Sequence, residues 1–210
     1  MSHVLVVCAK RYNGHELWVA LGVMQARGHT FEVVSQAPQI RDELTLRPNT
    51  IKRTVWDVDP IEAPNFDGIM IVSGNMADTE AYWDDRHVQS LIKAINTEHK
   101  AVGAICCSVP TISGVASGKK VSFYPLVRSR ERLRNAGAIL QTVALSVDGN
   151  LITAEHQMAS QVWAEEFCNF LEGLPQQHVF VDSQYTPRGR ERKPIADLER
   201  LKTALNRDEE

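Results

Sequence analysis

The sequence predicts a three-layer α/β/α sandwich, in which helices cover both faces of a mostly parallel central sheet. Short runs rich in β-branched residues alternate along the chain with longer segments whose apolar residues recur at helical spacing. Such alternation is typical of parallel sheets built from strand–helix–strand units. The 210 residues, of which 43% are hydrophobic and 23% charged, are enough for one such domain with a proper core.

The individual elements follow from local patterns. Strands are expected at 3–9, 29–35, 66–74 and 101–106, with a strand or hairpin arm at 50–58 and two strands around an Asp-Gly-Asn turn within 139–154. Helices are expected at 13–28, 84–100, from about Pro110, at 126–138 and at 156–173. Asn13 is the expected cap of the first helix, and Gly28, Gly137 and Gly173 are expected helix ends.

Composition and charge exclude several classes of protein. A formal net charge of −3 argues against nucleic-acid binding and against a general membrane-surface role. The N-terminal "MSHVLVVCAK" has no basic region or cleavage site, and no apolar run is long enough to cross a bilayer. The four cysteines form no CxxC pair and have no zinc-ligand spacing, so we expect no metal site, reduced thiols and a cytoplasmic location.

In a parallel sheet the functional site lies at the carboxyl ends of the strands. Residues 14–16, 73–75 and 106–108 each follow an expected strand. We therefore expect these three segments to meet on one rim of the sheet.

The stretch "AVGAICCSVPTISG", residues 101–114, puts two thiols where a strand is expected to turn into a helix. A nucleophile on such a turn is exposed, and the helix N-terminus favours the thiolate, which is the reactive form. Cys106 is the first residue after the expected strand, and Cys107 would supply a backbone donor. The alternative is that both cysteines are packing residues.

Four segments, in order, resemble the ThiJ/PfpI superfamily. "AICCSVPT" is similar to the nucleophile elbow of that family, and "FDGIMIVSG" resembles the strand before its oxyanion turn. "GKKVSFYPLVRSRERLRNAGA" and "VDGNLITA" resemble the family's later segments, so the likeness spans about residues 3–173. The resemblance implies a flavodoxin-like sandwich with a strand-to-helix nucleophile elbow.

The resemblance also implies roles for four residues. Cys106 would be the nucleophile, and Glu16 would be the acid that hydrogen-bonds it and handles a proton. The amides of Gly74 and Cys107 would form an oxyanion hole. From the residues alone, the favoured interpretation of Glu16 is an ordinary acid in the first turn of a helix.

The chain departs from the family pattern at the site itself. Many relatives carry a histidine directly after the nucleophile, where this chain has Cys107, and the elbow is one residue longer before its proline. Residues that could replace the missing base or contact substrate are His15, Tyr124, Glu155 and His156. Each has a plainer interpretation: a surface histidine or acid, or, for Tyr124, a core aromatic.

The adjacent thiols admit a redox interpretation as well. A disulfide between neighbouring cysteines is strained and therefore easily reduced, which suits a redox couple. The alternative is that the side chain of Cys107 simply packs.

The segment 174–210 differs in character from residues 1–173, which form the expected ThiJ/PfpI-like domain. It contains a basic linker, and its last part carries apolar residues on one helical face (Ile195, Leu198, Leu201 and Leu205). This C-terminal extension is expected to pack on the domain or on another subunit. The resemblance favours a homodimer or larger homo-oligomer.

Two classes of function are expected. The first is a cofactor-independent cysteine enzyme that acts on small reactive carbonyl compounds, with glyoxalase III or deglycase chemistry, or on amide bonds as a peptidase or other hydrolase. The second is an oxidative-stress redox sensor or holdase that uses the same cysteine. Glutamine hydrolysis is not expected, because neither the Gly-x-Cys-x-Gly elbow nor the late His-x-Glu of the amidotransferases is present. The expected partners are a small molecule and further copies of the chain, with no nucleic acid and no membrane.

Overall fold

The protein is built around a seven-stranded sheet with the order β11-β12-β8-β7-β1-β3-β6. The computed structural model describes residues 1–176. Every neighbouring pair in this sheet is parallel except β11 with β12, so the expected mostly parallel sheet is confirmed. Its strands are β1 (His3–Cys8), β3 (Thr30–Ser35), β6 (Arg53–Thr54), β7 (Gly68–Val72), β8 (Ala101–Ile105), β11 (Leu145–Asp148) and β12 (Leu151–Ala154).

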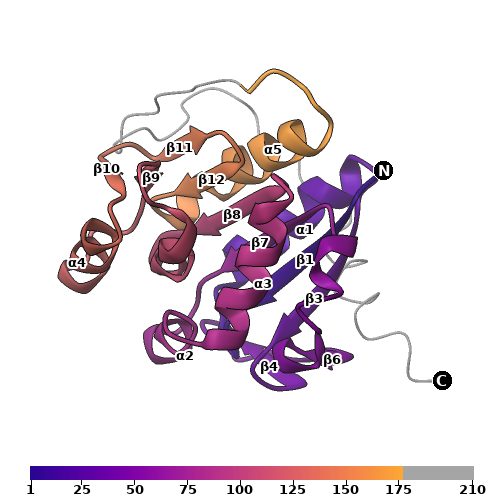
Figure 1. Ribbon diagram of the computed structural model, residues 1–210. Coiled ribbons are helices and arrows are strands. Elements are labelled where there is room, and N and C mark those ends of the chain that lie inside the picture. The colour runs from indigo at the N-terminus through magenta and orange to yellow at the C-terminus, as the bar shows by residue number, and fades with distance from the viewer. Residues whose placement is uncertain (177–210) are drawn as a thin grey trace, which may run out of the picture.

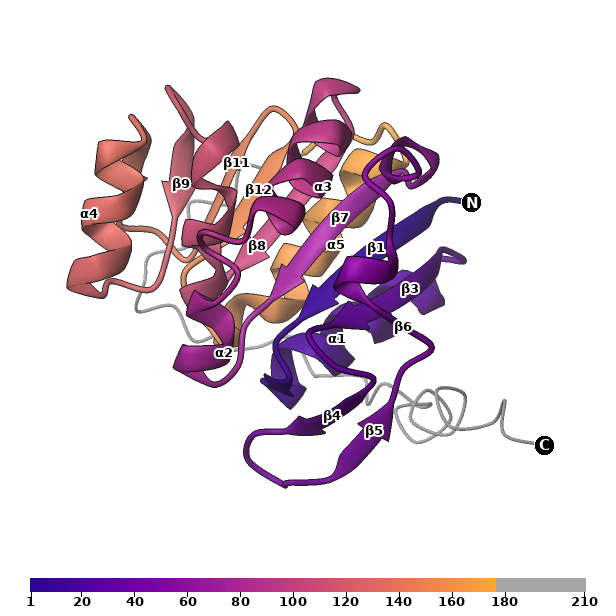
Figure 2. The ribbon, with the colours of Figure 1, turned by 60° about the horizontal axis from the view of Figure 1, so that its bottom comes forward.

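Helices cover both faces of the sheet, which gives the predicted three layers (Figures 1 and 2). Helices α1 (Gly14–Ala26) and α5 (Ser160–Leu171) lie on one face, and α3 (Arg86–Thr97) lies on the other with the 3-10 helix η3 (Cys106–Val115). Side chains of β1 alternate between the two layers, as a strand buried on both faces requires. Val4, Val6 and Cys8 pack toward α1 and α5, while Leu5 and Val7 pack toward α3 and η3.

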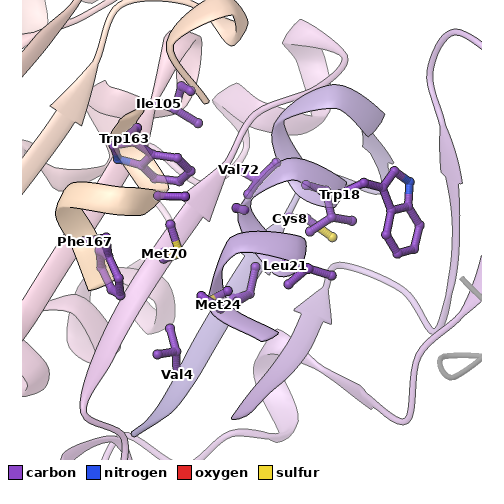
Figure 3. Close-up of a cluster of buried hydrophobic side chains, with 14 of the residues drawn as sticks. Val4, Cys8, Trp18, Leu21, Met24, Met70, Val72, Ile105, Trp163 and Phe167 are labelled. Carbon is purple, nitrogen blue, oxygen red and sulfur yellow. The ribbon is translucent and has the colours of Figure 1, made fainter. Parts of the chain in front are cut away.

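The α1/α5 layer holds the largest buried side chains. Trp163 and Phe167 of α5 and Met24 of α1 close over the sheet from one side (Figure 3). Helix α1 begins after Asn13, whose side chain accepts from the amides of His15 and Glu16, so the expected cap is confirmed. This cap fixes the first turn of α1 at the carboxyl edge of the sheet.

The irregular region 36–66 adds short elements beside that edge. A three-stranded sheet orders β2 (Arg11–Tyr12), β4 (Gln39–Asp42) and β5 (Pro48–Thr50). The expected strand at 50–58 is broken into β6 and the 3-10 turn η1 (Val55–Asp57), because the carboxylate of Asp57 accepts from the amide and hydroxyl of Thr54 and folds the chain back. A further 3-10 turn, η2 (Ala63–Asn65), precedes β7.

Three further elements differ from expectation. The short helix α2 (Met76–Glu80) follows β7 and was not predicted. The segment 139–154 forms three strands rather than two, because β10 (Ile139–Gln141) pairs with β9 (Lys120–Ser122) beside α4 (Val127–Asn135). The last expected helix begins with a 3-10 turn, η4 (Gln157–Ala159), before α5.

The helix expected from about Pro110 differs most from the structure. Residues after β8 form the 3-10 helix η3, which starts at Cys106 and contains Pro110. Proline has no amide hydrogen for an α-helical bond and clashes with the carbonyl one turn earlier, so the tighter 3-10 path is kept. The elbow therefore lacks the α-helical dipole that the sequence argument placed behind the thiol.

Residues 1–176 contain no helix long and apolar enough to cross a membrane. The basic linker and the apolar helical face expected in the C-terminal extension lie outside the described residues.

Candidate active site

The elbow after β8 carries Cys106 in a left-handed backbone conformation, with a φ of 60°. Non-glycine residues adopt this conformation at a cost of about 1–2 kcal/mol. The surrounding chain holds it: the hydroxyl of Ser108 lies 2.7 Å from the carbonyl oxygens of both Ile71 and Ile105 and accepts from the Ile105 amide. The turn is thereby tied to the ends of β7 and β8, and the Cys106 side chain remains partly exposed at the rim.

Glu16, in the first turn of α1, is fully buried beside this elbow. Its Oε2 accepts from the amide of Ser73 at 2.9 Å and from the hydroxyl of Ser73 at 2.7 Å. Its Oε1 is buried and makes no hydrogen bond to any nitrogen or oxygen.

Burial is the main influence on this carboxyl group. It raises the pKa of Glu16 to about 8, against the lowering effect of hydrogen bonds from Ser73 and from the Cys106 thiol. Glu16 is therefore mostly protonated at neutral pH. Because Oε2 accepts both bonds from Ser73, Oε1 is the oxygen that can carry the proton.

The two elbow cysteines are both free, and the Cys107 thiol donates to the Gly74 carbonyl oxygen at 3.9 Å. Hydrogen bonding from Cys106 is the largest cause that lowers the pKa of Cys107, to about 6, with burial opposing it and contacts to Ser73 and Thr79 lowering it further. The same contact, with burial and Glu16, raises the pKa of Cys106. The pair therefore loses one proton readily and a second only with difficulty.

The amides of the turn after β7 bond within the protein. The Gly74 amide donates to Thr79 Oγ1 at 3.1 Å, and the Asn75 amide donates to the Arg11 carbonyl at 2.7 Å. A side chain at Gly74 would place its Cβ 2.0 Å from the same carbonyl oxygen, so only glycine fits. An oxyanion donor at Gly74 would therefore have to release Thr79.

Two more of the predicted residues, Tyr124 and His156, lie next to each other, and Tyr124 contacts the elbow. The Tyr124 amide donates to the Cys106 carbonyl at 3.4 Å, and the Tyr124 ring lies 5.9 Å from the ring of His156, centroid to centroid. The Asn13 side chain, which caps α1, donates to Gln157 at 2.6 Å. The loop before α5 is thus held against both the elbow and the start of α1.

The other two candidate residues, His15 and Glu155, lie at or near the surface. His15 lies exposed on α1, and Glu155 is half-buried with its amide bonded to the Ala144 carbonyl. Burial raises the pKa of Glu155. Within residues 1–176 no group of three or more histidine, cysteine or acidic side chains could hold a metal ion.

Two residues at the site were not singled out from sequence. Ser73 holds Glu16 through both its amide and its hydroxyl, and Thr79 accepts from the Gly74 amide and lowers the pKa of Cys107. The Ser-Gly strand end is a usable signal for Ser73. Thr79 has none, because it lies on the short helix that the sequence pattern does not predict.

Several known proteins are similar to this chain. The chain is 29% identical over 171 residues to an uncharacterised protein of Methanocaldococcus jannaschii, covering 80% of this chain and 82% of that one. It is 24% identical over 170 residues to a deglycase of Thermococcus kodakarensis, covering 80% and 98%. A crystal structure of a ThiJ/PfpI domain protein from Brachyspira murdochii shares the fold, with a TM-score of 0.72 at 20% identity over 82% of this chain and 98% of that one.

The family model also matches. It describes the DJ-1/PfpI family and covers residues 2–169, from the first strand to the last helix of the sandwich. The chain belongs to the DJ-1/PfpI family.

Proposed function

We propose that the protein is a cysteine-dependent enzyme acting on small reactive carbonyl compounds, with Cys106 as nucleophile and Glu16 as proton donor. The observation that carries the proposal is the fully buried Glu16 carboxyl group beside a partly exposed thiol on a left-handed turn. A strained residue held rigidly at the end of a parallel strand is a common feature of functional sites. The relationship to a deglycase supports the carbonyl class of substrate.

The proposed step is the addition of sulfur to an aldehyde. The Cys106 thiolate forms a C–S bond to the carbonyl carbon, and the π electron pair of the C=O bond moves to oxygen. That oxygen takes the proton from Glu16 Oε1, which gives a hemithioacetal and a Glu16 carboxylate. The proton released earlier by the thiol restores Glu16 through solvent, so atoms and charge balance.

The state of Glu16 supports this direction of proton transfer. A carboxyl group with a pKa of about 8 is an acid rather than a base at neutral pH. Ser73 bonds only to Oε2, so Oε1 makes no hydrogen bond to a nitrogen or oxygen atom. A proton on Oε1 is therefore available to a substrate atom beside Cys106.

Peptide hydrolysis is less well supported. Expulsion of an amine requires a group that protonates it, and the residue after the nucleophile is a thiol rather than an imidazole. His156 packs on Tyr124, and its Nδ1 accepts from the Met158 amide at 3.4 Å.

The test is the consumption of methylglyoxal by the wild type, Cys106→Ser and the control Cys168→Ala, which removes a buried thiol of α5 remote from the elbow. We expect many equivalents consumed per chain by the wild type and the control, and none by Cys106→Ser. Consumption of at most one equivalent per thiol would instead favour the stoichiometric redox sensor. Equal turnover by Cys106→Ser would overturn the assignment of the nucleophile.

A further inference from the structure

We propose that Ser73 is a positioning residue, whose amide and hydroxyl together hold one oxygen of Glu16 as an acceptor and so keep the acid's proton on the other oxygen. This inference rests on the proposed role of Glu16 as proton donor. It adds to the site a residue that acts on the reaction through the acid and not by touching substrate.

Four hydrogen bonds join Asn13, Glu16 and Ser73 in a closed ring. The Asn13 amide donates to the Ser73 carbonyl at 2.9 Å, and the Asn13 side chain accepts from the Glu16 amide at 3.3 Å. The Ser73 amide and hydroxyl donate to Glu16 Oε2 at 2.9 and 2.7 Å. None of the three residues is more than 7% exposed, so water cannot readily replace these bonds. The end of β7 and the start of α1 are therefore locked together at the acid.

The two oxygens of the Glu16 carboxyl group differ in their surroundings. Oε2 has two lone pairs, and the two donors of Ser73 occupy them. A backbone amide can only donate, so a proton on Oε2 would compete with a bond that cannot reverse its direction. Oε1 is buried and makes no hydrogen bond to nitrogen or oxygen. The proton therefore belongs on Oε1, and loss of the Ser73 hydroxyl would free a lone pair of Oε2 to take it.

Ser73 also matters after the proton has left. Burial, the largest influence, raises the pKa of Glu16, and the Ser73 hydroxyl is the largest influence that lowers it. The titratable groups that act on Glu16 are the thiols of Cys107 and Cys106, both from the elbow. The Ser73 hydroxyl does not titrate, so it stabilises the carboxylate at every pH of interest. Its removal should both misplace the proton and make Glu16 a weaker acid.

The first experiment follows the Glu16 carboxyl carbon by ¹³C NMR, without substrate, and identifies its signal by its loss in Glu16→Gln. The wild-type titration midpoint should lie near pH 8. In Ser73→Ala it should rise by about one pH unit or more, whereas Ser73→Thr, which keeps the hydroxyl, should titrate near the wild type. The matched control Ser90→Ala removes a hydroxyl that bonds only within α3, to the Arg86 carbonyl, and should leave the midpoint unchanged.

The second experiment measures methylglyoxal turnover by the same variants. We expect Ser73→Ala to lower kcat by about tenfold or more with little change in KM, because the proton is misplaced while substrate binding is intact. The basic limb of its pH profile should move upward with the NMR midpoint, which a loss of packing alone would not cause. Absence of turnover in the wild type would count against the proposed function, whereas the NMR titration would still test Ser73.

An unchanged midpoint in folded Ser73→Ala would overturn the proposal, and so would an unchanged kcat in that variant of an active wild type. If the Ser73 variants fail to fold, infrared spectroscopy of the wild type decides, through the carboxylic acid band that disappears around pH 8. A carbonyl oxygen that accepts two hydrogen bonds absorbs at a lower frequency than a free one. A band at the frequency of a free carbonyl would contradict the proposal.

Discussion

Two cysteines stand at carboxyl ends of strands in one sheet, and their surroundings differ. Cys8 closes β1, is fully buried under α1, and has its pKa raised by burial to about 12 (Figure 3). Cys106 follows β8, turns at a φ of 60° and remains partly exposed beside Glu16. The residue type and the sheet are the same, so the difference comes from the backbone path after the strand and from the side chains that face it.

The largest expected difference between the two strand ends is in alkylation rate. In the native protein Cys8 reacts only through opening of the core, so we expect it to be labelled at least about a thousandfold more slowly than Cys106. Peptide-resolved labelling at neutral pH measures this ratio, and denaturant should bring it close to one. Comparable native rates would mean that the two strand ends do not differ in the way described.

The second expected effect is on stability and concerns Glu16. The folded protein keeps its proton up to about pH 8, whereas the unfolded chain gives it up near the ordinary value of 4.5. Protonation therefore stabilises the fold, and this contribution is lost as the pH rises through that window, by a few kcal/mol at most.

Glu16→Gln provides the matched comparison. Glutamine can accept from Ser73 as the neutral acid does, but it does not titrate. The lowered pKa of Cys107 makes stability rise with pH above about pH 6, which opposes the effect of Glu16. Both proteins keep Cys107, so the difference between their free energies of unfolding gives the contribution of Glu16 alone. Urea unfolding at several pH values measures this difference. If the free energy of unfolding depended on pH in the same way in both proteins, the raised pKa of Glu16 would be contradicted.

The smallest expected effect concerns backbone strain. At Cys106 the left-handed conformation favours glycine, so Cys106→Gly should be more stable than Cys106→Ala by about 1 kcal/mol. At Cys8, inside a strand, the order should reverse, with glycine about 0.5–1 kcal/mol less stable than alanine. The same sign of the glycine–alanine difference at both positions, in urea unfolding, would show that the elbow is not strained.

The sandwich could be predicted from sequence because the main strands are short apolar runs and several of the main helices have a cap or a glycine at their ends. The Asn13 cap and the strand ending at Ile105 are local features, so the approach of α1 and the elbow followed from parallel-sheet geometry alone. Short elements such as α2 were missed because five residues do not display a period.

The contacts within the candidate site are harder to predict from the sequence. Pro110 is the fifth residue after β8, and the sequence pattern alone does not distinguish the 3-10 path that it imposes from an α-helix. The hydrogen bond of the Gly74 amide depends on the position of Thr79. The lowered pKa of Cys107 depends on the side chains that surround it. These contacts are tertiary, and no spacing in the sequence encodes them.

The most direct test of the account is the pH dependence of kcat/KM for methylglyoxal. The proposed activity would require one thiolate in the pair, which forms above about pH 6, and a protonated Glu16, which persists up to about pH 8. We therefore predict a bell-shaped profile with its maximum between these two values. A rate that continues to rise above pH 8 would contradict the account, because Glu16 would then be acting as a carboxylate rather than as the acid.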